Sequence, residues 1–195
     1  RDTLREHLGF DRRYLWVGTA ARLEPVKGVD LFLDAAVRLA QKRDDVRFAV
    51  FGAGSQEAEL RKKAAPLGDR LHFMGFCNEI EQALGLLDVA VVPSRSEAFC
   101  LSAAEALSME TPVAAFDVDG VGEVVRDGET GLLAPAEDTA ALAERMEALL
   151  TDDALRARLG TQGRELVLRE FTAETMTKKT QALYDELLRG KGKER

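Results

Sequence analysis

Two glutamates in the segment SEAFCLSAAE, Glu97 and Glu105, stand eight positions apart. Two carboxyl groups that act as acid and base on one glycosidic bond lie roughly 5 to 9.5 Å apart. Eight residues of continuous helix, at about 1.5 Å each, would separate the two Cα atoms by about 12 Å. The spacing therefore predicts contacts with opposite ends of one elongated ligand, in place of an acid–base pair.

Two cations, Arg22 and Lys27, flank a proline-containing loop in the segment TAARLEPVKG. Gly28 follows them and precedes a segment of helical pattern. Two positive charges on one loop can neutralise a diphosphate and stabilise a nucleotide leaving group without a metal ion. The alternative interpretation is a pair of ordinary solvated surface charges.

Glycines stand at two further strand-to-helix connections. FGAGS contains Gly52 and Gly54, and DVDGVGEVVRDGETGLL contains Gly120. Glycine lets the backbone come close to a ligand near a helix N-terminus. A dinucleotide fingerprint would need a third glycine, and Glu57 occupies that place. The segments therefore predict either ligand-facing turns or plain structural turns.

Three consecutive residues, Phe99, Cys100 and Leu101, open the helix that carries Glu105. Free amide groups at a helix start point toward an anion, so we expect backbone contacts with a ligand here. The same position favours a lowered pKa for the Cys100 thiol. A thiol nucleophile would also need a base, and no histidine is placed for that role. We expect His72, inside the third strand, to serve packing.

Phe76 and Cys77 follow that third strand. The Phe76 ring either lies beside a flat base or belongs to the core, and the sequence leaves both interpretations open. Cys77 and Cys100 have neither the spacing of a disulfide framework nor that of a metal site. We therefore expect no bound metal, and reduced thiols in a cytoplasmic protein.

The elements that position these residues are predicted by short, continuous apolar runs at 15–19, 46–51, 71–74, 89–92, 112–116 and 131–133. Strands that are apolar on both faces are typical of a parallel sheet covered by helices. Segments of helical period alternate with them, at 30–42, 56–65, 80–86, 101–109, 139–150, 152–169 and 173–188. The alternation predicts a doubly wound, Rossmann-like α/β domain of about six strands.

The candidate residues follow strands, and ligands of doubly wound sheets bind beyond the carboxyl ends of the strands. We therefore expect these residues on one rim of the sheet. The last two helices are expected to close over one edge of the sheet or to reach for a second domain. Residues 15–188 would form the single domain, 1–14 a linker and 189–195 a disordered tail.

The chain is acidic, with 27 basic against 34 acidic side chains among 195 residues and a formal net charge of −7. This balance argues against nucleic acid or an anionic membrane as a partner. Neither a secretory signal nor an apolar run near the length of a membrane span is visible. Any phosphate site must therefore be local.

The motifs RLEPVKG, FGAGS, FMGF, EAFCLSAAE and DGVGEVVRDGETGLL together resemble those of the retaining, nucleotide-sugar-dependent glycosyltransferases of family 4. The resemblance covers residues 15–188 and points to the C-terminal, donor-binding domain, which is one half of the two-domain GT-B fold. It implies transfer of a hexose-type sugar from a nucleoside diphosphate donor such as a UDP-sugar, with no cofactor and no metal.

By this resemblance Arg22 and Lys27 would hold the donor diphosphate and offset the charge of the leaving group. Glu97 would contact hydroxyls on the reacting face of the donor sugar, and Glu105 the ribose hydroxyls. The remaining donor contacts would come from Gly52, Gly54, Phe76, Cys77, Phe99, Cys100, Leu101 and Gly120.

One position adds a negative charge that the family pattern lacks. Asp119 stands in place of the first of two glycines before Val121. An acidic side chain beside a diphosphate is unfavourable unless it turns away or contacts a sugar hydroxyl.

In this family an N-terminal domain binds the acceptor and supplies a histidine to the catalytic cleft. We expect the present chain to bind a nucleotide sugar but to transfer sugar poorly or not at all without such a partner. The helix at 173–188 would lean on that domain. Two alternatives stay open: a half-domain of a sugar-nucleotide epimerase, and a non-catalytic nucleotide-binding or interaction domain.

Overall fold

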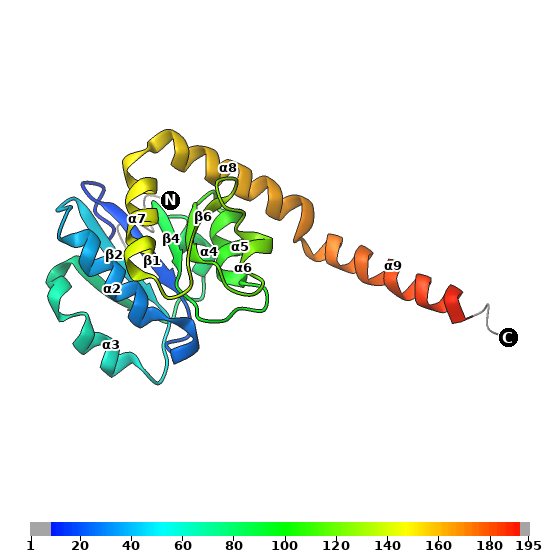
Figure 1. Cartoon of the computed structure of the whole chain (residues 1–195), viewed down its shortest axis with the longest axis horizontal. Coiled ribbons are helices and arrows are strands. Elements are labelled where there is room, and N and C mark those ends of the chain that lie inside the picture. The colour runs from blue at the N-terminus through cyan, green and yellow to red at the C-terminus, as the bar shows by residue number, and fades with distance from the viewer. Residues whose placement is uncertain (1–8, 192–195) are drawn as a thin grey trace.

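The computed structural model describes residues 9–191, and for residues 190 and 191 the backbone alone. Six strands form one parallel sheet in the order β3-β2-β1-β4-β5-β6. Their bounds are β1 Leu15–Ala20, β2 Val46–Phe51, β3 Leu71–Gly75, β4 Val89–Val92, β5 Val113–Phe116 and β6 Gly131–Ala134. Figure 1 shows helices on both sides of this sheet. The doubly wound, Rossmann-like α/β fold is confirmed.

The continuous apolar runs become strands because both of their faces are covered. Every residue of β4 and β5 is buried. β1 pairs with β2 along its whole length, from Leu15 opposite Val46 to Ala20 opposite Phe51. The predicted bounds of β2 and β4 are confirmed, and those of the other four strands differ by one residue.

The helices and short helical turns alternate with the strands. They are η1 Pro25–Lys27, α2 Val29–Ala40, α3 Glu57–Lys63, η2 Ala65–Arg70, α4 Ile80–Leu84, α5 Leu101–Ser108, α6 Val121–Val124, α7 Thr139–Thr151, α8 Asp153–Glu170 and α9 Ala173–Lys191. Two clusters of buried side chains divide them: α2, α3 and α7 contribute to one cluster, and α4, α5 and α6 to the other. The sheet therefore lies between two helical layers.

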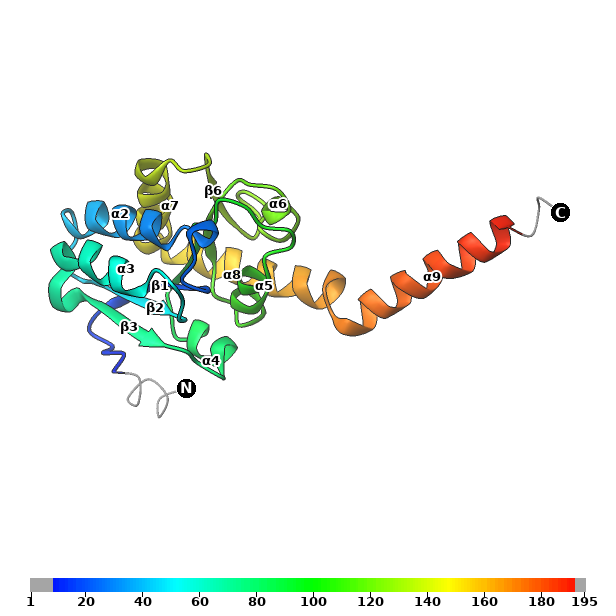
Figure 2. The same cartoon turned by 90° about the horizontal axis from the view of Figure 1, so that it is seen from below.

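The two last helices differ in what they contact. α8 supplies Leu159 to the first cluster and Val167 to the second, so it closes the end of the sandwich. α9 projects away from the body in both views (Figures 1 and 2). α8 therefore provides the predicted closure, whereas α9 extends outward and its contact with a second domain stays a prediction.

The ends of the domain lie outside the limits predicted from the sequence. Phe10, within the predicted linker, is 3% exposed, and its ring centroid lies 4.2 Å from that of Trp16. α9 continues through Lys191, into the predicted tail. Residues 1–8 of the predicted linker and 192–195 of the predicted tail lie outside the described residues.

His72 is exposed, which corrects the expectation that it packs inside a buried strand. Its strand, β3, forms the outer edge of the sheet, where only one neighbouring strand is present. The imidazole keeps one ring contact, with Trp16 at 5.4 Å between centroids.

Within residues 9–191, no helix combines the length and apolar character needed to cross a bilayer.

Candidate functional site

Two adjoining cavities lie beyond the carboxyl ends of the strands. The first has a volume of about 400 Å³ and is lined by Thr19, Ala20, Ala21, Lys27, Val92, Pro93, Ser94, Glu97, Ala98, Phe99, Cys100, Leu101, Ser102 and Glu105. The second has a volume of about 410 Å³ and is lined by Ala20, Ala21, Arg22, Phe51, Gly52, Ala53, Phe76, Cys77, Ile80 and Glu105. Because Ala20, Ala21 and Glu105 line both, the cavities form one elongated site at the predicted rim.

The loop after β1 carries Lys27 to the first cavity. η1 ends at Lys27, and Gly28 follows in the left-handed conformation, with φ 63°. A Cβ atom at Gly28 would lie 1.9 Å from the carbonyl oxygen of Pro93. Glycine is therefore required where this loop crosses the end of β4.

Arg95, in the loop after the neighbouring strand β4, fastens the same loop. Its guanidinium donates to the carbonyl of Pro25 at 2.7 Å and, through two nitrogens, to both carboxylate oxygens of Asp30 at 2.8 Å. The hydrogen bonds from Arg95 hold the pKa of Asp30 below its usual range. Sequence reasoning missed Arg95, because neither its spacing nor its neighbours indicate a partner 65 positions away.

Lys27 and Glu97 form an ion pair in the first cavity. The Lys27 Nζ lies 2.6 Å from Glu97 Oε1, and the two side chains are 21% and 12% exposed. The Ser94 hydroxyl donates to the same carboxylate oxygen at 3.0 Å. The predicted phosphate-binding cation and the predicted sugar-binding carboxylate therefore pair with one another.

α5 begins beside this ion pair. Cys100 is its N-cap, with φ 66° and no side-chain capping bond, and Leu101 is 68% exposed. The predicted lowered pKa of the Cys100 thiol is wrong: burial raises it to about 11. Loss of hydration outweighs the favourable helix start because only 2% of the residue is exposed. A thiolate nucleophile is not formed here at neutral pH.

Glu105 lies where the two cavities meet. Burial raises the pKa of its carboxyl group, and the negative charge of Glu81 adds to the effect. Glu97 precedes the helix and Glu105 lies inside it, so the continuous helix assumed for the spacing estimate is not formed. Both carboxylates nevertheless line the first cavity, as the sequence predicted for one rim.

The second cavity has a more apolar wall and one cation. Phe76 is 77% exposed, so the core interpretation of this aromatic is wrong and its ring borders the cavity, beside Cys77. Arg22 is exposed and lines the second cavity, whereas Lys27 lines the first. The two cations predicted to act together therefore lie on the two parts of the site.

The glycines of FGAGS serve close backbone packing. A Cβ atom at Gly52, where φ is 124°, would lie 1.9 Å from the carbonyl oxygen of Ala21, and one at Gly54 would lie 2.5 Å from that of Leu23. Gly52 lines the second cavity, whereas Gly54 lines neither cavity. The turn is thus structural and brings only its first glycine to the site.

Within the described residues, no group of three or more His, Cys, Asp or Glu side chains is arranged to hold a metal ion. The charged side chains of the site are Arg22, Lys27, Glu97 and Glu105. Two are cations and two are carboxylates, so their formal charges balance.

The sequence model described as "Glycosyl transferases group 1" matches residues 1–166. The chain belongs to the group 1 glycosyltransferases. It is 32% identical over 193 residues to the alpha-D-kanosaminyltransferase of Streptomyces kanamyceticus, covering 96% of this chain and 49% of that protein. The chain thus spans about half the length of this curated relative.

Two solved structures place this glycosyltransferase domain within the GT-B architecture. HepE of Anabaena in complex with UDP-glucose superposes with a TM-score of 0.86 at 25% identity, covering 95% of this chain and 52% of that chain. The C-terminal domain of the group 1 protein LpcC from Francisella tularensis gives a TM-score of 0.75 at 28% identity, covering 82% of this chain and 87% of that chain. The fold is one half of GT-B, and it matches a C-terminal domain.

Asp119 turns toward a neighbouring loop in this glycosyltransferase domain. Its carboxylate accepts from the Ser96 hydroxyl at 2.6 Å and from the Glu97 amide at 3.2 Å. The bond from Ser96 lowers the pKa of Asp119. The next residue, Gly120, donates its amide to the Glu97 carbonyl at 3.0 Å and has no room for a Cβ atom, which would lie 2.2 Å from the Ala98 carbonyl oxygen. Both residues therefore hold the Glu97 loop, and Gly120 lines neither cavity.

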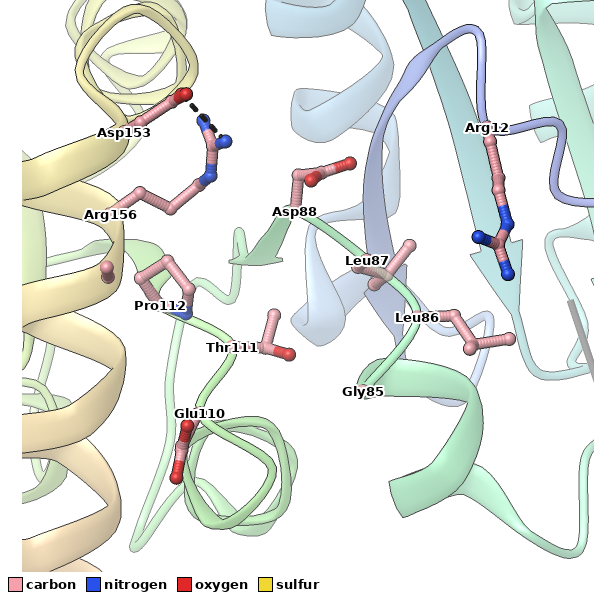
Figure 3. Close-up of a pocket in the computed structure, with 11 residues that line it drawn as sticks. Arg12, Gly85, Leu86, Leu87, Asp88, Glu110, Thr111, Pro112, Asp153 and Arg156 are labelled. Carbon is pink, nitrogen blue, oxygen red and sulfur yellow. Dashed lines mark ion pairs between the residues drawn. The ribbon is translucent and has the colours of Figure 1, made fainter. Parts of the chain in front are cut away.

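A third cavity, of about 380 Å³, lies at the amino ends of the strands, opposite the candidate site (Figure 3). Arg156 is paired with Asp153 at 2.8 Å and donates to the Leu149 carbonyl. Asp88 accepts from the Trp16 amide at 2.7 Å. The residues that line this cavity include none of those that the sequence singled out for a ligand, so this cavity is not the candidate site.

Proposed function

We propose that this domain binds the donor of a retaining, metal-independent glycosyltransferase that transfers a hexose-type sugar from a UDP-sugar in the cytoplasm. The observation that carries the proposal is one elongated site with Glu105 at its middle, where its two cavities meet. A Lys27–Glu97 ion pair lies in the first cavity, and an exposed aromatic ring borders the second. A nucleotide sugar has the matching sequence of groups: sugar, diphosphate, ribose and base.

In this arrangement the diphosphate lies near Lys27 and the start of α5. The ammonium supplies a charged donor, and the first turn of the helix presents backbone amides that lack helical partners. Both are favourable for an anion, and neither requires a metal ion. When the bond between the sugar and the diphosphate breaks, its electron pair stays on the phosphate oxygen. The same donors stabilise that developing charge.

The two glutamates would hold the two hydroxyl-bearing parts of the donor. Glu97 keeps its second carboxylate oxygen for sugar hydroxyls, because Lys27 and Ser94 both bond to Oε1. Glu105 would accept from the ribose hydroxyls, and the base would lie along Phe76 and Cys77 in the second cavity. Arg22 lines this same cavity and would add positive charge beside the nucleotide.

The relatives support this class of donor. HepE of Anabaena is described in complex with UDP-glucose, and the S. kanamyceticus relative is a kanosaminyltransferase. The first binds UDP joined to a hexose, and the second is named for the transfer of a single sugar residue. Both fit a site that holds a nucleotide at one end and a sugar at the other.

An acceptor-binding domain would complete the enzyme, since the S. kanamyceticus relative and HepE are each about twice as long as this chain. α9 offers a surface for it, because five of its large apolar side chains are between 53% and 70% exposed: Met176, Leu183, Tyr184, Leu187 and Leu188. The substitution Leu187→Glu should change the stability of this domain by less than about 0.5 kcal/mol, since the side chain is exposed. It should weaken association with an acceptor domain added in trans, measured by sedimentation. Unchanged association would exclude α9 from that interface.

Calorimetric titration of the chain with UDP, GDP and ADP tests the donor site. The proposal predicts saturable binding of UDP, weakened by Lys27→Ala and by Glu105→Ala. Binding of another nucleotide at the same residues would retain the site and correct the base. If a folded sample bound none of the three nucleotides, the domain would be non-catalytic or would need its partner to form the site. The same would hold if both variants bound UDP as the wild type does.

A further inference from the structure

The break between α8 and α9 contacts a residue that lines the first cavity. Phe171 follows the last residue of α8, and its ring contacts Phe99 edge-on, with 5.2 Å between centroids and 67° between planes. Phe99 lines the first cavity. The two rings come from positions that are 72 residues apart, so this contact connects the end of the domain to the donor-binding loop.

Phe171 packs beside Cys100, the residue of this loop that has a positive φ. Phe99 and Phe171 are both partly buried and pack against the cluster that contains Cys100. Cys100 adopts φ 66°. This conformation is unfavourable for a residue with a side chain and persists only where the surroundings hold it. The aromatic pair is part of those surroundings. The start of α5, which would face the diphosphate, therefore depends on Phe171 for support.

The preceding residue, Glu170, contacts the other loop of the site. Its carboxylate accepts from the Arg126 guanidinium, with both oxygens at 3.3 Å. Arg126 follows α6, and Gly120, just before α6, donates its amide to the Glu97 carbonyl. Glu170, the last residue of α8, and Phe171, the residue after it, thus contact the segments that follow β5 and β4 respectively.

The break is also joined firmly to α9. The Thr172 hydroxyl accepts from the Thr175 amide at 3.1 Å, which caps the first turn of α9. The Thr175 hydroxyl contacts the carbonyl of Arg169, in the last turn of α8, at 3.4 Å. A change in the direction of α9 would therefore move Phe171, and Phe171 would move Phe99.

We propose that Phe171 is a positioning residue: it holds Phe99 and the start of α5 in the donor-binding arrangement and couples the orientation of α9 to the affinity for the donor. The second half of this statement rests on the proposed function. The first half concerns the loop itself and is tested without a nucleotide.

The alkylation rate of Cys100 reports on the loop. Cys100 is 2% exposed, so iodoacetamide reaches it only when the loop opens. In a Cys77→Ser background, Phe171→Ala should raise the rate about 2- to 13-fold, the factor expected for the loss of one aromatic pair. Phe171→Tyr should restore the wild-type rate because the ring is kept. Leu168→Ala, in the last turn of α8 and 54% exposed, is the control and should leave the rate unchanged. If Phe171→Ala does not fold, Phe171→Leu replaces it.

A rate for Phe171→Ala equal to that of Leu168→Ala would overturn the support of the loop. The second measurement is a double-mutant cycle with Phe99→Leu and Phe171→Leu, read as the Kd for UDP. Coupling predicts that the second substitution weakens UDP binding less once the first is present. Additive effects, or UDP binding that is unchanged while Cys100 labelling is faster, would overturn the link to donor affinity. A wild-type protein that binds no UDP would refute the proposed function instead, and the labelling rates would still decide whether Phe171 supports the loop.

Discussion

Lys27→Met separates the two roles that the structure gives to Lys27, in the fold and in the site. The substitution keeps most of the aliphatic chain and removes the ammonium group, which leaves the Ser94 hydroxyl to donate to the Glu97 carboxylate at 3.0 Å. Glu97 is only 12% exposed in the pair, so water replaces the lost partner poorly. Removing one member of a buried pair costs about 3–5 kcal/mol, and a hydrogen bond to a charged group contributes about 1.5–3 kcal/mol.

The lower range applies to this pair, because Lys27 keeps 21% exposure and Glu97 keeps one hydroxyl donor. We expect Lys27→Met to lower the free energy of unfolding by about 1.5–3 kcal/mol, equivalent to a fall in Tm of about 3 to 12 °C. Adding Glu97→Gln removes the unpaired charge and should return the stability to within about 1 kcal/mol of the wild type.

UDP binding should respond differently. UDP carries the diphosphate but no donor sugar, so its affinity reports Lys27 without the proposed sugar contact of Glu97. We expect a Kd about 10- to 150-fold weaker in the single variant, and a Kd that stays weak in the double variant although stability has recovered. Lys42→Met is the matched control. Lys42 pairs with Glu147 at 2.8 Å, but its side chain is 59% exposed and it lines neither cavity of the site. A Lys27→Met Kd equal to that of Lys42→Met would refute the assignment of the diphosphate to Lys27.

Three further predictions follow from the geometry of the site. Gly28→Ala should lower the Tm far more than Gly128→Ala, because both glycines have positive φ but only the Cβ at position 28 meets an atom, the Pro93 carbonyl oxygen at 1.9 Å; similar losses would mean that the loop yields easily. Glu105 has a raised pKa in the folded protein, so its ionisation opposes folding. The stability of the wild type relative to Glu105→Gln should be greatest below the ordinary carboxyl pKa and should fall as pH rises through the folded pKa. A stability difference that does not change with pH in urea titrations would contradict the burial of the Glu105 charge. Iodoacetamide at neutral pH should label Cys77, which is half-buried, well before Cys100, whose pKa is about 11; peptide mass spectrometry showing Cys100 labelled first would show that the helix start outweighs burial.

The sequence predicted the sheet well because its strands are apolar on both faces, a property of each segment alone. The same holds for the rim: once the strands are parallel, the residues that follow them must gather at their carboxyl ends. Lys27, Glu97 and Glu105 line one cavity for that reason. Strand bounds shifted by one residue where a run ends in a small residue, as at Ala20 and Gly75.

Pairings between distant segments could not be predicted, because they depend on which atoms the tertiary fold brings within bonding distance. The Lys27–Glu97 ion pair spans 70 positions and the Arg95–Asp30 pair 65. The contact between Phe99 and Phe171 has the same character. The predicted lowered pKa of Cys100 was wrong for a related reason: a helix start is visible in the sequence, but the burial that raises the thiol pKa is not. For Asp119 the sequence did state the requirement, namely that its carboxylate turn away from a diphosphate or contact a sugar hydroxyl. The carboxylate turns to Ser96 and Glu97.

The central claim is that a nucleotide sugar binds along the carboxyl rim, and mapping amide chemical-shift changes by NMR during a UDP titration tests it most directly. The account predicts that the largest changes fall on Lys27, on residues 98–105 and on the segment around Phe76, with little change at the third cavity around Asp88 and Thr111. The largest changes at that opposite edge, or no saturable change at any amide of the folded domain, would contradict it.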